Sequence, residues 1–303
     1  MMAEASAARA EEYLADVARQ VEARLDQALP AESEDPATLH ASMRYSTLGG
    51  GKRLRAALVL ASCRALGGPP EAALAVACAV EMIHAYSLIH DDLPCMDNGQ
   101  LRRGKPTNHR VFGDAVATLA GDALLTLAFE ELASIPLGLG VTAQTVVQVV
   151  AEISRAAGSR GMVGGQVADL QAEGRDIDLE RLRAIHRRKT GALILACVRS
   201  GALLACAGAA ALKMMDEYGR HLGLAYQIVD DILDETGDQA VVGKGTHTDL
   251  LRGKATYPRL VGLEESRRLA REAVLAAQNA LEPLGEDARP LLDLAAYVAR
   301  RDR

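Results

Sequence analysis

The sequence predicts an all-α protein that folds as one bundle of helices around a large core. Of its 303 residues, 49% are apolar, which is enough for a sizeable interior. Most of these residues recur every three or four positions, as on one face of a helix, rather than alternating as in a strand. No long linker or compositional break divides the chain. We therefore expect residues 1–303 to form a single domain.

The first third of the chain is predicted to hold four helices. Residues 3–29 form an amphipathic pattern, and a second pattern starts at Leu39 and stops at the glycines 49–51. Residues 56–66 form an apolar helix, and the Gly-Gly-Pro-Pro turn that follows ends in a proline suited to a helix start. Residues 71–90 are apolar nearly all round, which predicts a helix inside the bundle rather than on its surface.

Helical patterns continue through the middle of the chain. They cover residues 115–134 and 142–157, although the second segment contains a β-favouring patch at 146–150. Since no second strand-like segment accompanies that patch, we expect it to be helical. Asp178 suits the N-cap of a further helix.

Residues 191–212 are the most apolar segment and could suggest a membrane span. Arg199 lies at its middle and glycines interrupt it, so a buried helix is favoured over a stable membrane insertion. A helix from Lys213 then runs into an acidic cluster, and 268–281 form a last amphipathic helix before a charged, solvated tail.

Charge and cysteine content restrict the class of partner. A formal net charge of -6 argues against nucleic acid, so an anionic substrate must meet a local cluster of lysines and arginines. The five cysteines have no metal-type spacing and lie mostly in apolar context, which favours a reducing cytoplasm. The first twenty residues lack the apolar stretch of a signal peptide.

Two acidic clusters each follow a long apolar segment. In the first, Asp91 and Asp97 are six positions apart with Pro94 between them, so we expect the helix to bend there. In the second, Asp230 and Asp234 are four apart, which places them one turn from each other on a helix. Clustered carboxylates stay charged at neutral pH only beside cations. Such ligands suit Mg²⁺; two solvated helix ends are the alternative, which the repetition of the pattern disfavours.

Two basic segments could bind an anion. Gly49–Gly51 leave backbone amides accessible, and Lys52, Arg53 and Arg55 follow at once, although a basic surface turn is the alternative. Arg102 and Arg103 follow the first acidic cluster, as a magnesium-diphosphate site would require, and a salt bridge within the loop is the alternative.

Together these motifs make the chain resemble the short-chain trans-prenyl diphosphate synthases, specifically the bacterial farnesyl and geranylgeranyl diphosphate synthases. The resemblance extends over nearly the whole length, from Gly50-Gly51-Lys52-Arg53-Leu54-Arg55 through both acidic motifs and Lys189-Thr190-Gly191 to Lys254-Ala255-Thr256-Tyr257-Pro258. It implies an all-helical fold around a deep central cavity, usually as a homodimer.

The resemblance also assigns roles to individual residues. It implies that Mg²⁺ is held by Asp91, Asp97 and Asp230, with Asp92 and Asp231 completing the catalytic acidic motifs. The residues matching positions around the allylic diphosphate are Arg102, Lys189, Thr190, Gln227, Lys244 and Lys254. Those matching the isopentenyl diphosphate pocket are Lys52, Arg55, His84 and Arg103, although a buried histidine such as His84 is as readily a core residue. One departure is that Asn98-Gly99-Gln100 follow Asp97, where many relatives have further aspartates.

Product length is implied by the residues upstream of the first motif. Tyr86, with Ser87 beside it, lies more than one helical turn before Asp91, where a bulky side chain would stop the growing tail. Together with the Pro94-Cys95 insertion, this resembles the bacterial farnesyl-forming type, with geranylgeranyl diphosphate as the alternative product. Tyr86 could instead be core packing.

Two other functions compete with this one. A class I terpene cyclase would share the fold and the ionisation step, but would not need the isopentenyl diphosphate positions Lys52, Arg55 and Arg103. A non-catalytic partner subunit should have lost one acidic cluster, and this chain keeps both.

Overall fold

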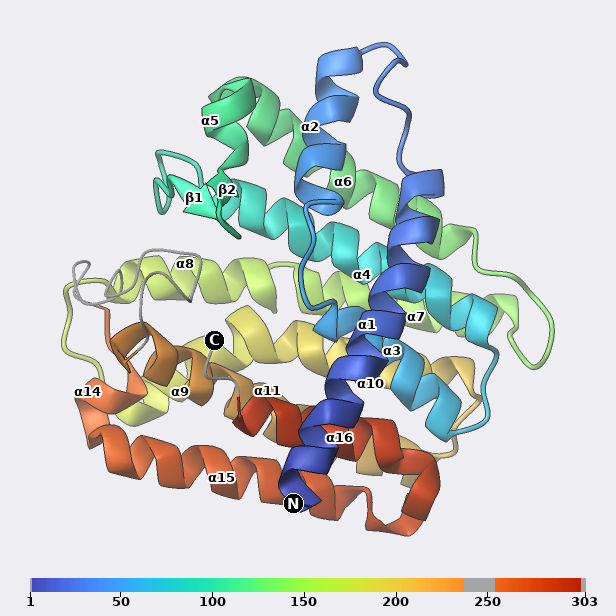
Figure 1. Cartoon of the computed structure of the whole chain (residues 1–303), viewed down its shortest axis with the longest axis vertical. Coiled ribbons are helices and arrows are strands. Elements are labelled where there is room, and N and C mark those ends of the chain that lie inside the picture. Colours follow the sequence, from blue (N-terminus) through green and yellow to red (C-terminus); the bar gives the residue numbers. More distant parts are fainter. Residues whose placement is uncertain (1, 237–253, 301–303) are drawn as a thin grey trace.

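The computed structural model describes residues 2–236 and 254–300, and within them the fold is all-α, as predicted (Figure 1). The helices are α1 (Met2–Ala28), α2 (Ala37–Thr47), α3 (Leu54–Ala65), α4 (Pro70–Asp91), α5 (Asn108–Phe112), α6 (Asp114–Ala133), α7 (Ala143–Ala157), α8 (Met162–Ala172), α9 (Leu179–His186), a π-helix η1 (Arg187–Gly191), α10 (Ala192–Leu204), α11 (Ala209–Thr236), α14 (Tyr257–Val261), α15 (Leu263–Ala280), a 3-10 segment η2 (Glu282–Ala288) and α16 (Arg289–Ala299). The one sheet in these ranges is a hairpin of β1 (Leu101–Arg102) and β2 (Lys105–Pro106).

Helix α4 is the centre of the bundle. It packs against α1, α2, α3, α6 and α10, and buried residues surround most of its circumference, as its apolar sequence predicts. By length and composition it is the one helix of the described chain that could cross a membrane, yet 78% of that apolar window is buried within the protein. Such burial is typical of a core helix.

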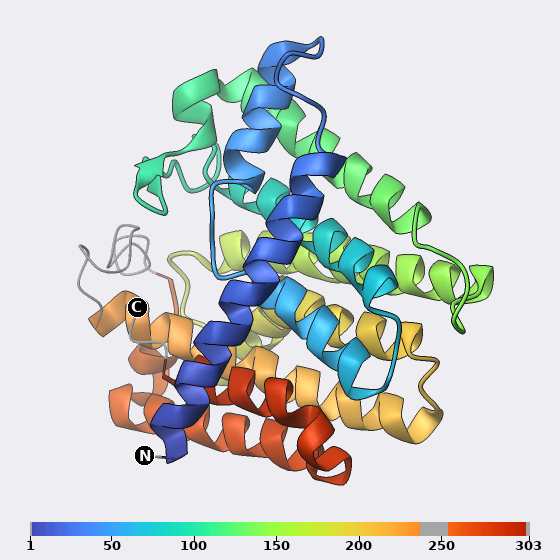
Figure 2. The ribbon, with the colours of Figure 1, turned by 45° about the vertical axis from the view of Figure 1, so that its right-hand side comes forward.

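Helix α1 lies diagonally across the bundle, from the side of α15 and α16 to the side of α2 (Figure 2). Val17, Val21 and Leu25 are buried, which confirms the predicted apolar face. Close to its start, the guanidinium of Arg9 donates two hydrogen bonds, of 2.8 and 2.7 Å, to the buried carboxylate of Asp293 on α16. The first and last helices of the chain are therefore bonded to each other.

The prediction of one buried helix over 191–212 is wrong, because two helices share this segment. Helix α10 ends at Leu204, and α11 begins at Ala209 rather than at Lys213. Between them Cys206 has a positive φ of 54°, and the Ala207 N–H bonds to the Ala202 carbonyl at 3.0 Å. This C-terminal turn reverses the chain, so α10 and α11 pack against each other.

The other predicted segments are helical with small shifts at their ends. The valine patch 146–150 lies in α7, whose first turn is closed by a capping box between Thr142 and Thr145. The Asp178 carboxylate caps α9 by accepting a hydrogen bond from the Arg181 N–H at 2.8 Å. Both agree with the predictions from the sequence.

Candidate active site

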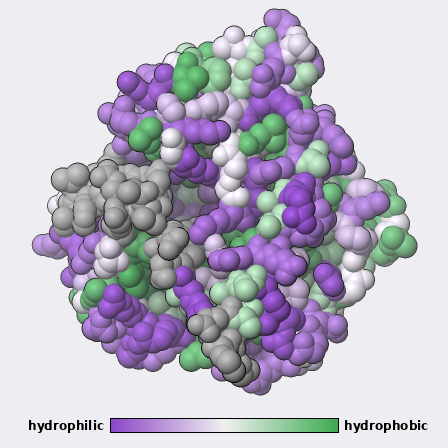
Figure 3. Space-filling model, viewed as in Figure 1, coloured by the Kyte–Doolittle hydropathy of each residue, from purple (hydrophilic) through white to green (hydrophobic). Residues whose placement is uncertain are grey.

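A cavity of about 1430 Å³ lies between the end of α4, the start of α3, helix α8, η1 and the end of α11. In Figure 3 a hollow lies in this region, between the hairpin and α8, and hydrophilic residues gather along its edge. The cavity collects every predicted site residue that the structure describes: Lys52, Arg55, His84, Tyr86, Ser87, Asp91, Asp92, Asp97, Arg102, Arg103, Lys189, Thr190, Gln227, Asp230, Asp231 and Lys254. Lys244 lies outside the described residues. A deep central cavity is therefore present, as the resemblance implies.

The first acidic segment is a compact turn rather than a bent helix. Helix α4 ends at Asp91, before Pro94, so the predicted bend at this proline is wrong. The Asp97 N–H bonds to the Asp91 carbonyl at 2.8 Å, which closes the segment and brings the two aspartates together. Burial raises the pKa of Asp91 to about 6; Lys189 opposes this shift, and the neighbouring Asp97 adds to it. The charged form of Asp91 is therefore disfavoured by burial, and a cation bound beside it would stabilise that form.

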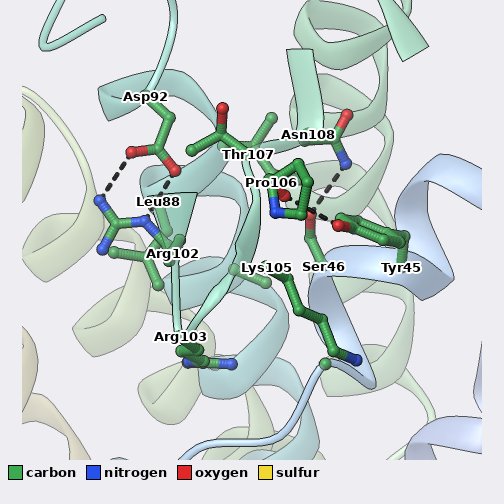
Figure 4. Close-up of a pocket in the computed structure, with 13 residues that line it drawn as sticks. Tyr45, Ser46, Leu88, Asp92, Arg102, Arg103, Lys105, Pro106, Thr107 and Asn108 are labelled. Carbon is green, nitrogen blue, oxygen red and sulfur yellow. Dashed lines mark hydrogen bonds and ion pairs between the residues drawn. The ribbon is translucent and has the colours of Figure 1, made fainter. Parts of the chain in front are cut away.

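The Asp92 carboxylate is directed at the Arg102 guanidinium (Figure 4). The Arg102 Nε and Nη2 atoms donate to its two carboxylate oxygens at 2.7 and 2.8 Å, and Asp92 is only 3% exposed. A Cβ at Gly99 would lie 2.5 Å from the Asp92 Oδ1 atom, so the residue there must be glycine for the carboxylate to fit. The salt bridge considered for this loop is thus present at Arg102.

Arg103 is directed elsewhere by the turn of the hairpin. Arg103 and Gly104 both have positive φ, 54° and 75°, as a tight two-residue turn requires. The Arg103 guanidinium donates to the Gly50 carbonyl, and a Cβ at Gly51 would lie 2.8 Å from it. The hairpin therefore places Arg103 against the glycine triplet, joining the two basic segments in one pocket.

The hairpin and the start of α5, which follows it in the chain, are each hydrogen-bonded to α2 (Figure 4). The Tyr45 hydroxyl donates to the Pro106 carbonyl at 2.8 Å, and the Asn108 amide donates to the Ser46 hydroxyl at 2.8 Å. These bonds fix the hairpin that carries Arg102 and Arg103.

The three cations after the glycine triplet have different surroundings. Arg53 is buried and bonds to the Glu81 carboxylate at 3.3 Å and the Thr47 carbonyl at 2.8 Å, so it stabilises the start of α3. The Lys52 ammonium lies over the Tyr297 ring at 5.3 Å from its centroid, a cation–π contact with α16. Arg55 lines the cavity, and its Nε atom is buried without a hydrogen-bond partner.

His84 lies beside these arginines on the cavity wall. Burial, together with Arg55 and Arg103, lowers its pKa well below the usual range, so the imidazole is neutral. A neutral ring can donate one hydrogen bond without adding to the positive charge of this pocket.

The aspartates of the second acidic cluster differ in burial. Asp230 and Asp231 both line the cavity, but Asp231, like Asp234, is buried at the end of α11. The Asp231 carboxylate accepts hydrogen bonds from the Gln227 Nε2 atom at 3.0 Å and from the Tyr257 N–H at 2.9 Å. Gln227 in turn accepts a hydrogen bond from the Thr190 hydroxyl at 2.8 Å. Asp231 therefore fixes Gln227 and, through it, Thr190.

Asp169 on α8 is a site residue that is not predicted from the sequence. Its carboxylate lies 2.7 Å from the Lys189 Nζ and 3.6 Å from the Lys254 Nζ, so it holds both ammonium groups at the cavity. Burial lowers the pKa of Lys189, but Asp169 and Asp91 outweigh this and raise it above its ordinary range. A Cβ at Gly165 would lie 2.2 Å from the Lys189 backbone nitrogen, so glycine lets α8 approach η1. The available signal was Gly164-Gly165 with Asp169 shortly after it.

These groups fit magnesium and a diphosphate. Among residues 2–236 and 254–300, no three His, Cys, Asp or Glu side chains form a metal site by themselves. Mg²⁺ commonly takes one or two carboxylates and completes its shell with water and phosphate oxygens, which suits Asp91, Asp97 and Asp230. The buried Gln166 Nε2 atom on the cavity wall has no protein partner and could donate to such an oxygen.

Comparisons of the sequence with a family model and with known proteins all point to one family. Residues 36–286 match the family model described as Polyprenyl synthetase. The chain is 46% identical over 294 residues to "Putative geranylgeranyl pyrophosphate synthase 8, chloroplastic" of Arabidopsis thaliana, covering 96% of this chain and 81% of that protein. It is 47% identical over 291 residues to the "Dimethylallyltranstransferase" of Fischerella ambigua, covering 96% and 83%.

Two solved structures are similar to this protein over almost its whole fold. An FPP/GFPP synthase from Zymomonas mobilis, in its apo form, has a TM-score of 0.87 at 38% identity, covering 97% of this chain and 99% of that one. A geranyltransferase from Helicobacter pylori, complexed with magnesium and isoprenyl diphosphate, has a TM-score of 0.82 at 32% identity, covering 94% of both chains. With its helical cavity, acidic motifs and basic pockets, the chain belongs to the polyprenyl synthetase family, as a trans-prenyl diphosphate synthase.

Proposed function

We propose that this enzyme condenses isopentenyl diphosphate with dimethylallyl and then geranyl diphosphate, and releases the fifteen-carbon farnesyl diphosphate. The observation that carries the choice of product is the position of Tyr86 on the cavity wall. Tyr86 is 5% exposed and lies five residues before Asp91 in the continuous helix α4, which is about 7.5 Å along the axis.

The allylic diphosphate would bind at the acidic rim. Asp91, Asp97 and Asp230 would hold Mg²⁺, which when bound supplies Lewis-acid stabilisation of the leaving diphosphate. Lys189 and Lys254, both held by Asp169, would bind its oxygens from the opposite side. Arg102 is bonded to Asp92, so it would present its remaining N–H groups and its charge. The C–O bond then breaks, the diphosphate takes the electron pair, and an allylic cation remains.

Isopentenyl diphosphate would bind in the pocket of Lys52, Arg55 and Arg103, with neutral His84 as a hydrogen-bond donor. All four residues line the cavity, and Arg103 is directed by its bond to the Gly50 carbonyl. The double bond of isopentenyl diphosphate attacks the allylic cation and a C–C bond forms. Loss of a proton from the product cation then restores a double bond. The apolar helices around the cavity would keep water from the cation.

Product length follows from where the tail runs. With the diphosphate bound at the acidic residues, the growing chain would extend along α4 towards Ser87 and Tyr86. The buried Tyr86 ring would then block the addition of a further five carbons on that path. Geranylgeranyl diphosphate is the second candidate, because several relatives carry that product in their names.

The test is chromatography of dephosphorylated products. Wild type and Tyr86→Phe, which keeps the ring, should give the fifteen-carbon alcohol, and Tyr86→Ala should give longer ones. Unchanged products from Tyr86→Ala would show that another residue stops the chain, and a twenty-carbon product from wild type would favour the second candidate.

The same assay separates the rival functions. A terpene cyclase would release hydrocarbons from an allylic diphosphate alone, and a non-catalytic subunit would give no product with isopentenyl diphosphate. We further propose a homodimer in a reducing cytoplasm, as the resemblance and the free thiols of all five cysteines suggest, and light scattering would test the first.

A further inference from the structure

His90 lies between the proposed product-length residue and a neighbouring helix. Its ring contacts that of Tyr86 edge to face, with centroids 5.7 Å apart and planes at 76°. The two residues are four apart in α4, so they share one face of the helix. Both line the cavity.

On its other side His90 is bonded to α6. Its Nε2 atom lies 3.0 Å from the Thr118 carbonyl, and since a carbonyl only accepts, Nε2 carries the proton. The Asp122 carboxylate is 3.9 Å from the same atom. These contacts fix the ring of His90 relative to α6 as well as to α4.

Gly121 makes room for this arrangement. A Cβ there would lie 2.1 Å from the His90 Nε2 atom and 2.5 Å from its Cδ2 atom. A glycine inside a helix such as α6 costs roughly 0.5–1 kcal/mol relative to alanine. The chain therefore carries a locally unfavourable residue at the one point where the His90 ring enters α6.

From these contacts we propose that His90 is a positioning residue for product length: anchored on α6 at Thr118 and Gly121, it holds the Tyr86 ring across the path of the growing tail. A tyrosine ring moves by rotation about its first side-chain torsion. With the His90 edge against it, the rotation that would open the path is opposed by an aromatic contact worth about 0.5–1.5 kcal/mol. The inference rests on the proposed function, in which Tyr86 stops elongation.

The experiment compares product distributions of wild type with His90→Ala, Tyr86→Ala and the double variant. We expect His90→Ala to raise the ratio of twenty- to fifteen-carbon product roughly tenfold, as the loss of an aromatic contact and a hydrogen bond would give. The double variant should match Tyr86→Ala alone, because His90 acts through the ring that is then absent. His90→Gln keeps an N–H for the Thr118 carbonyl and should restore part of the wild-type ratio.

Gly121→Ala provides an independent route, because its methyl group displaces the His90 ring without altering α4. It should lengthen products in wild type and leave the Tyr86→Ala distribution unchanged. A purely structural role for His90 would lower activity or stability without moving the product ratio.

The outcomes separate two failures. If Tyr86→Ala lengthens products while His90→Ala and Gly121→Ala still give only the fifteen-carbon product, His90 has no positioning role. If His90→Ala lengthens products further in the Tyr86→Ala background, His90 acts independently and the inference is overturned. If Tyr86→Ala leaves the products unchanged, Tyr86 is not the barrier, and the proposed choice of product fails first.

Discussion

Asp92 accepts two hydrogen bonds from Arg102, at 2.7 and 2.8 Å, and thereby separates the functions of two adjacent arginines. Arg102 is bonded to a buried carboxylate of its own loop, whereas Arg103 is exposed and reaches the glycine triplet. Neighbours with the same side chain should therefore respond differently to the same substitution.

Arg102→Ala should destabilise the protein, because it leaves the Asp92 carboxylate buried and unpaired. Loss of a partner from a buried ion pair costs about 3 kcal/mol. Urea unfolding followed by circular dichroism would measure the change in the free energy of unfolding. Arg103→Ala is the matched control and should stay within about 0.5 kcal/mol of wild type. Equal losses for the two variants would contradict this division.

Arg103→Ala should instead weaken the binding of one substrate, isopentenyl diphosphate. We expect its KM for isopentenyl diphosphate to rise about tenfold to a hundredfold, since charge-assisted hydrogen bonds contribute roughly 1.5–3 kcal/mol. Lys189→Ala should impair the step that uses the allylic diphosphate by a similar factor. Steady-state kinetics with each substrate varied in turn would measure both, and identical profiles for the two variants would argue against separate pockets.

Asp230 and Asp231 are adjacent, but their substitution by alanine should have different effects on activity and stability. Asp230→Ala should lower kcat by several orders of magnitude with an unchanged unfolding curve, because its carboxylate faces the cavity. Asp231→Ala should also lower the free energy of unfolding, because it removes the acceptor for Gln227 and the Tyr257 N–H.

Metal removal gives a parallel test of this site. Chelation with EDTA should abolish turnover of wild type, and added Mg²⁺ should restore it. Near-normal turnover by Asp230→Ala, or full activity in excess EDTA, would rule out the proposed metal site.

The contribution of His186 to the stability of the unliganded enzyme should be lost in mild acid. Burial lowers the pKa of His186 to about 4 in the folded protein, while its pKa in the unfolded chain is near 6.5. Between these two pH values the unfolded chain therefore binds a proton that the folded protein does not bind. The His186 contribution is therefore full above about pH 6.5 and declines towards pH 4, with a slope of up to about 1.4 kcal/mol per pH unit. Asp91 acts in the opposite direction below about pH 6, because burial raises its pKa to about 6.

His186→Gln should flatten that decline between pH 6.5 and pH 5, measured by urea unfolding at each pH. A slope unaltered by His186→Gln would show that other groups carry the pH dependence.

The parts of the fold that could be predicted depend on local periodicity. The apolar faces of α1 and α7 repeat every three or four residues, and the circumference of α4 is apolar, so each determines its own burial. The candidate site could be located because its charged residues occur in short, recognisable motifs.

What could not be predicted depends on contacts between distant segments. The partner of Lys189 is Asp169, twenty residues away on another helix, and the close approach of α8 to η1 depends on Gly165. The π-helix itself has no period that distinguishes it from α-helix over five residues. The break before α11 is not predictable from local pattern, because residues 205–208 are nearly as apolar as the helices they separate.

The contact between Lys52 and Tyr297 makes the last helix a component of the active site rather than an appendage to the bundle. Because α16 is also bonded to α1 through Arg9 and Asp293, a shift of these helices would reach the lysine that we propose binds isopentenyl diphosphate. Fusions, truncations or labels placed on α16 should therefore alter the kinetics of that substrate, and kinetic comparisons of this enzyme call for one fixed carboxyl-terminal sequence.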